Sequence, residues 1–179
     1  MTTVATKEAF DVLRQLLGQQ PRMPPEKLIA NPDETKPMSE ADGLREWTDG
    51  NAAVSKDSPS PPPLIERNDP RLSLWVVRTA DVVYAAEGCS FGKSLASGVI
   101  KHTNLTGGGP AYSGGELVLL DQYTIVVNGR SGRYGPRSAL DLHGAVKAFA
   151  DSGYRVWYMP WDEDANRPAP FGALPNPFL

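Results

Sequence analysis

The chain is poor in the residues that usually hold metals or staple small folds. It has a single cysteine among 179 residues, Cys89, and two histidines, His102 and His143. One cysteine excludes a disulfide within the chain and any multi-cysteine zinc site. Two histidines give a thin basis for a metal centre, so we expect no metal and no resident cofactor.

Long apolar runs and excess positive charge are also lacking. No apolar stretch is long enough to span a bilayer, and the N-terminus has no basic region followed by an apolar stretch, as a secretory signal would. The net charge of −3 argues against bulk binding to nucleic acid or anionic membranes. We therefore expect a cytoplasmic protein, or one delivered by a dedicated secretion system without a signal peptide.

The first third reads as a helical extension rather than a domain. Apolar spacing predicts an amphipathic helix over 6–18 and a second helix over Ser39–Trp47. Residues 49–63 end in Ser-Pro-Ser-Pro-Pro-Pro, which is typical of a semi-rigid linker. The expected organisation is a helical extension and Pro-rich linker over 1–63 and a β-rich domain with a Pro-rich tail over 64–179. The helix over 6–18 docks either on its own domain or on a partner.

The remainder alternates short β-rich runs with turns. It predicts strands over 72–78, 82–86, 99–103, 116–120, 123–127 and 155–159, a helix over 139–151 capped by Ser138, and an irregular tail whose Trp161, Phe171 and Phe178 pack back as a strap. The fold class is α+β: a twisted antiparallel sheet of about five strands with one packed C-terminal helix and an N-terminal helical extension.

Two polar, glycine-rich loops, 102–116 and 128–136, form the candidate site. Three residues are candidates for catalysis. His102 can act as acid or base, Glu116 can orient it or a ligand hydroxyl, and Tyr134 can hydrogen-bond. The competing interpretation is structural: the glycines serve turns and the polar groups satisfy buried backbone.

The same loops carry the candidate binding residues. Arginine side chains can hold a carboxylate or phosphate in fork geometry, and glycines let backbone approach a ligand closely. The candidates are Thr103, Gly107, Gly108, Arg130, Ser131 and Arg133.

A glycine-rich segment earlier in the chain imitates a phosphate-binding loop. Gly88 to Ser94 ends in Gly-Lys-Ser, but three residues separate its two glycines where the phosphate loop has four. A further glycine follows too soon for the long helix that such a loop requires. These departures argue against a nucleoside triphosphatase.

The two loops resemble a module of bacterial polymorphic toxins and effectors and of plant IQ-motif proteins. That family pattern has a His-Ser-Ser start, a Gly-Gly loop, a Gly-Glu opening a strand and a Ser-Gly-His-Tyr-x-Pro loop before a helix. The corresponding segments here are His102-Thr103-Asn104, Gly107-Gly108-Gly109-Pro110, Gly115-Glu116 and Ser131-Gly132-Arg133-Tyr134-Gly135-Pro136. Thr103-Asn104 replaces the two serines and Arg133 the second histidine. The resemblance implies a β-rich module of an effector or bacterial conflict system.

Three functions stay open from the sequence. The first is a ligand- or partner-binding module with a polar pocket between the two loops. The second is a toxin-type enzyme on a nucleotide-like substrate, including an NAD-dependent ADP-ribosyltransferase, which Arg78, Thr103 and Glu163 resemble in order. The third is a chaperone or immunity-type protein that wraps a protein partner with residues 1–60. The sequence alone does not decide whether the chain is an enzyme.

Overall fold

A computed structural model describes residues 4–18, 21–24, 31–51 and 61–179. Residues 52–60 of the linker predicted over 49–63 lie outside these ranges. The helices are α1 (Val4–Leu17), η2 (Pro32–Thr35), η3 (Glu40–Asp42), α2 (Ser90–Lys93), α3 (His102–Thr106) and α4 (Ala139–Asp151). The strands are β1 (Arg45–Glu46), β2 (Ser73–Val77), β3 (Val82–Ala86), β4 (Ser113–Asp121), β5 (Thr124–Asn128), β6 (Arg155–Tyr158), β7 (Trp161–Asp162), β8 (Arg167–Pro168) and β9 (Asn176–Pro177).

One sheet dominates the fold. Within the described residues it has seven strands in the order β1-β3-β2-β4-β5-β6-β9. The α+β class is as predicted, but the sheet is larger than about five strands and is mixed, because β5 and β6 run parallel. Helix α4 makes the crossover between them, as a parallel pair requires. The additional edge strands β1 and β9 have two residues each, too few to carry a periodic signal.

Several local predictions are confirmed. Helix α4 spans 139–151, and the Ser138 hydroxyl accepts a hydrogen bond from the Asp141 backbone N–H at 3.1 Å. The hairpins β2–β3 and β4–β5 form where they are expected. In the tail, Phe171 is buried and Trp161 and Phe178 pack against the core.

Three local predictions are wrong. The tail is not irregular throughout, because β7 and β8 pair with each other and β9 adds an edge strand next to β6. The strand expected over 99–103 is replaced by helix α3, whose first turn is closed by Asn104 Oδ1 accepting from the Lys101 N–H at 2.7 Å. The helix expected over 39–47 is a single 3₁₀ turn followed by β1. There Trp47 donates its backbone N–H to Val82 O at 2.8 Å and buries its indole, so sheet pairing and burial outweigh helix propensity.

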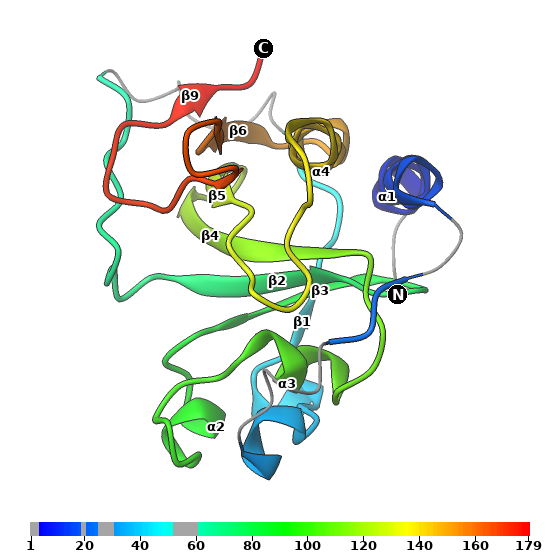
Figure 1. The fold of residues 1–179 in the computed structure, drawn as a ribbon, viewed down its shortest axis with the longest axis vertical. Helices are drawn as coiled ribbons and strands as arrows, with labels where there is room; N and C mark the ends of the chain where they lie inside the picture. The colour runs from blue at the N-terminus through cyan, green and yellow to red at the C-terminus, as the bar shows by residue number, and fades with distance from the viewer. Residues whose placement is uncertain (1–3, 19–20, 25–30, 52–60) are drawn as a thin grey trace.

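The sheet has two differently covered faces (Figure 1). On one face, α1 and α4 cover a core that includes Phe10, Trp47, Trp75 and Phe149. On the other face, α2 and α3 cover a second apolar cluster near β2 and β3. Since Phe10 and Trp47 belong to the main core, the boundary drawn at residue 63 does not separate two hydrophobic cores, and the α1 stripe docks on its own domain.

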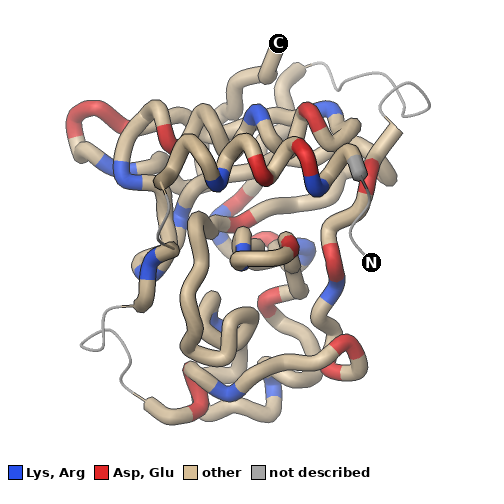
Figure 2. The backbone as a smooth tube through the Cα atoms, turned by 90° about the vertical axis from the view of Figure 1, so that its right-hand side faces the viewer, with Lys and Arg blue, Asp and Glu red and all other residues tan. Residues whose placement is uncertain are grey.

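Alternation along β4 decides which side chains face which cluster. Leu117 points to the α1 and α4 side, and Val118 joins a third apolar cluster with Val126, Trp157 and Phe171 on the opposite face. Seen from the side of α1, basic and acidic residues are interspersed along the backbone (Figure 2). No helix within the described ranges is long and apolar enough to cross a membrane.

Candidate functional site

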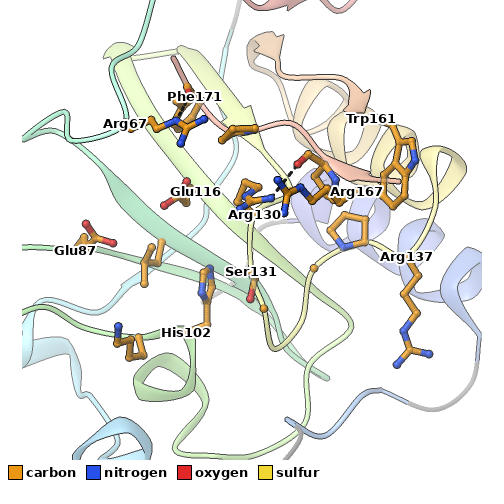
Figure 3. A pocket seen from close by; sticks show the side chains of 18 of the residues that line it. Arg67, Glu87, His102, Glu116, Arg130, Ser131, Arg137, Trp161, Arg167 and Phe171 are labelled. Atoms are coloured by element: carbon orange, nitrogen blue, oxygen red, sulfur yellow. Dashed lines mark hydrogen bonds between the residues drawn. The ribbon is translucent and has the colours of Figure 1, made fainter. Parts of the chain in front are cut away.

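A cleft of about 720 Å³ opens on the face of the sheet away from α1 and α4. Leu74 and Glu116 lie at its floor, opposite each other on β2 and β4. Its walls come from the loop after β5, from the segment that enters α3, and from the tail around β7 and β8 (Figure 3). The site therefore combines segments that are far apart in the sequence.

Positive charge predominates around the cleft. The basic residues that line it, within the described chain, are Arg22, Arg67, Lys101, Arg130, Arg137 and Arg167, and the acidic ones are Glu87 and Glu116. The whole chain has a net charge of −3. A local excess of guanidinium groups in an acidic protein favours an anionic ligand at this place.

The tail brings three of these arginines together. The Arg130 guanidinium donates to Pro168 O at 3.3 Å, and Arg167 immediately precedes that proline. Arg67 donates from Nε to Phe171 O at 3.3 Å. Because these partners are carbonyl oxygens, the positive charges are oriented by the tail without being neutralised by it.

Arg22 adds a fourth guanidinium, which is hydrogen-bonded to the loop after β5. It donates to the carbonyl oxygens of Tyr134 and Gly135. Burial, and secondarily the nearby Arg137, lower its pKa to about 10, although Asp141 acts in the opposite direction. The side chain stays protonated at neutral pH, and its lowered pKa results mainly from the cost of burying its charge.

Glu116 is held from the neighbouring strand. Asn128, its partner in the β4–β5 register, is fully buried and donates from Nδ2 to Glu116 Oε1 at 2.9 Å. The Asn128 side-chain Oδ1 accepts from the Glu116 backbone N–H at 2.9 Å and from the Arg130 backbone N–H at 3.0 Å. One asparagine side chain thus positions both the Glu116 carboxylate and the start of the loop after β5, which carries Arg130.

Burial is the main cause that raises the pKa of Glu116. The Asn128 hydrogen bond and Arg130 oppose this effect, while Glu87 adds to it. Burial also raises the pKa of Glu87, against the influence of Lys101. Both carboxyl groups therefore release their protons less readily than solvated glutamates do.

His102 reaches the cleft from the start of α3. Its Nε2 is 2.8 Å from Gly115 O, and because a carbonyl only accepts, Nε2 carries the proton of the neutral ring. Burial, opposed by this hydrogen bond and assisted by Arg133 and Lys101, lowers its pKa to about 4. The imidazole is therefore neutral and weakly basic at neutral pH, and it ties α3 to β4.

The structure places four of the predicted site residues in the cleft lining: His102, Glu116, Arg130 and Ser131. The Ser131 hydroxyl also accepts from the Tyr134 backbone N–H at 3.1 Å, which closes the turn of its loop.

The other predicted site residues lie outside the lining and in internal contacts. Thr103 donates to Glu34 O, Arg133 pairs with Glu34, and Gly107 and Gly108 adopt positive φ at the end of α3. Tyr134 is buried, and its hydroxyl donates to Gly109 O at 2.7 Å, which joins the two glycine-rich loops.

The residues that resemble an ADP-ribosyltransferase set are not gathered here. Arg78 pairs with Asp81 at 2.7 Å and donates to Leu105 O, and Thr103 is fully buried. Glu163 is exposed between β7 and β8. None of Arg78, Thr103 and Glu163 lines the cleft.

The sequence analysis did not identify four of the residues that build the site: Arg22, Arg67, Arg167 and Asn128. Three of them come from segments outside the two polar loops, and Asn128 ends a strand whose other residues are mostly apolar. The surplus of arginine over carboxylate becomes visible only when the fold assembles these segments.

Comparisons with models of known protein families, with curated proteins and with solved structures found no match to this chain. Within the described residues, no group of three or more His, Cys, Asp or Glu side chains is arranged to hold a metal ion.

Proposed function

We propose that this chain is a binding module whose cleft takes a small anionic ligand that carries phosphate groups, and that it serves in a bacterial effector or toxin system. The observation that carries the proposal is the set of five arginines and one lysine around the cleft, against two carboxylates. The effector context rests on the resemblance of the two loops alone.

Phosphate suits this site better than a single carboxylate does. Guanidinium groups present paired N–H donors that match phosphate oxygens, and several of them share a multiply charged group well. Arg130 and Arg67 are already oriented by carbonyl oxygens of the tail, so part of the entropy cost of binding is met before the ligand arrives.

Calorimetric titration with pyrophosphate tests this function. We expect the whole chain to bind pyrophosphate at low salt and more weakly as salt increases, because the attraction is electrostatic. Arg130→Gln should weaken binding by about tenfold or more, as expected for loss of a charged hydrogen bond.

Lys147→Gln is the matched control, because it removes one positive charge from an exposed ion pair on α4. It should leave the affinity for pyrophosphate within about twofold. Failure of the wild type to bind, or an equal loss in both variants, would contradict the proposal.

A second candidate, an enzyme on a phosphorylated, nucleotide-like substrate, is favoured by one observation. Glu116 is a partly buried carboxyl group with a raised pKa inside an anion-binding cleft, and such groups serve in general acid–base catalysis. Glu116→Gln should then abolish turnover while substrate still binds.

An assay of NAD consumption at high protein concentration tests the NAD-dependent form of this enzyme hypothesis. Absence of NAD turnover would refute that form.

A further inference from the structure

The cleft has two chemically different sides. Figure 3 shows Glu87, Glu116 and His102 on one side and Arg130, Arg167 and Trp161 on the other. Arg67 lies on the first side, above Glu116, so that side holds both carboxylates with one labelled arginine. A ligand with negative charge along its whole length would meet the two carboxylates at the first side. The ligand must therefore combine an anionic part with a part that donates hydrogen bonds.

From this arrangement, and resting on the phosphate-binding function proposed above, we infer that the ligand is a ribonucleoside diphosphate. Its phosphates lie at Arg130 and Arg167, and its ribose hydroxyls donate to Glu116. Glu116 is then a specificity-determining residue for the sugar, and the arginines supply most of the affinity.

The position of Glu116 fits this role. It sits in a central strand between β2 and β5, so its backbone is fixed on both sides. Asn128 occupies Oε1, and within the described part of the chain no protein donor contacts Oε2. A carboxylate has acceptor sites to spare for two neighbouring hydroxyls, and a phosphate placed there would be repelled.

Trp161 completes the argument for a nucleoside rather than a bare sugar phosphate. It is half-buried and lines the cleft on the arginine side, next to the tail that carries Arg167. Stacking of a base on an aromatic side chain contributes about 1–3 kcal/mol and tolerates any base. A cleft of about 720 Å³ lies in the usual size range for nucleotide-sized ligands.

The test compares four probes on the whole chain by calorimetry: ADP, 2′-deoxy-ADP, ribose 5-phosphate and pyrophosphate. We expect ADP to bind at least about tenfold more tightly than pyrophosphate, and about tenfold more tightly than 2′-deoxy-ADP, as loss of a charged hydrogen bond predicts. In Glu116→Gln, the preference for ADP over 2′-deoxy-ADP should fall below about threefold. Pyrophosphate should bind this variant as well as it binds the wild type, or more tightly, because a repelling charge is removed.

The outcomes separate this inference from the function on which it rests. Equal affinity of the wild type for ADP and 2′-deoxy-ADP overturns the ribose contact and needs no variant. If ADP and pyrophosphate both depend on Arg130 but respond alike to Glu116→Gln, phosphate binding stands and the assignment of Glu116 fails. If ribose 5-phosphate binds as tightly as ADP, the ligand is a sugar phosphate and the nucleoside is refuted. If the wild type binds neither ADP nor pyrophosphate, the nucleotide inference and the proposed phosphate-binding function are both refuted.

Discussion

Acid sensitivity should originate in large part from one buried side chain, His102. The residue is 8 % exposed, and burial lowers its pKa from the usual 6.5 to about 4. Above pH 6.5 the ring is neutral in the folded and unfolded chains, so its neutral form costs nothing. Between pH 6.5 and 4, His102 is protonated in the unfolded chain but stays neutral in the folded chain. The free energy of unfolding therefore decreases as the pH is lowered.

The size of the effect follows from the pKa difference. Each pKa unit corresponds to about 1.4 kcal/mol, so the free energy of unfolding should fall by about 3 kcal/mol across this window because of His102. The variant His102→Gln can keep a donor toward Gly115 O but has no proton to gain. It should therefore lack this part of the pH dependence.

Urea unfolding of the wild type and of His102→Gln, at steps from pH 8 to pH 4, measures this pH dependence. The quantity of interest is the difference in unfolding free energy between wild type and His102→Gln, because the titration of Glu87 and Glu116 is common to both proteins. This difference should be constant above pH 6.5. Below pH 6.5, the wild type should lose unfolding free energy relative to His102→Gln. His143→Gln, which replaces an exposed histidine on α4, is the control for the substitution itself. A constant difference down to pH 4 would refute the reasoning.

Two further predictions concern packing. Phe10→Ala should lower the unfolding free energy by about 3–5 kcal/mol, because the ring is fully buried and packs edge-on against Phe149, with 5.2 Å between the ring centroids. Val12→Ala, at an exposed position of the same helix, is the control in thermal and urea melts. An equal effect of both substitutions would show that α1 is not part of the core. Tyr134→Phe should cost about 1–3 kcal/mol through the lost hydroxyl contact with Gly109 O while leaving pyrophosphate affinity unchanged. Tyr123→Phe, with its exposed hydroxyl, should stay within about 0.5 kcal/mol, and a loss of affinity in Tyr134→Phe would place that residue in the site.

Local chemistry predicted the elements that are stabilised locally. Ser138 capping α4 and the two β hairpins follow from residues close to one another in sequence. The failures occur where distant contacts decide. Trp47 looks helical in its own neighbourhood, yet it is buried among Tyr84, Phe149 and Tyr154.

The candidate site divides in the same way. Glu116, Arg130 and His102 stand out because the polar loops around them do, and the structure places all three in the cleft. Arg67 and Arg167 carry no local sign of a site, since each lies among prolines and ordinary polar residues. Their contribution depends on the tail returning across the sheet, which no short-range pattern encodes.

The alternation along β4 also constrains how this protein can diverge. Glu116 and Leu117 are adjacent in sequence but serve the cleft and the main core, respectively. A one-residue insertion or deletion in this strand would exchange the two faces, placing a carboxylate in the core and a leucine in the cleft. Relatives of this chain should therefore vary in ligand preference through substitutions in the loop after β5 and in the tail, while the length of β4 is kept.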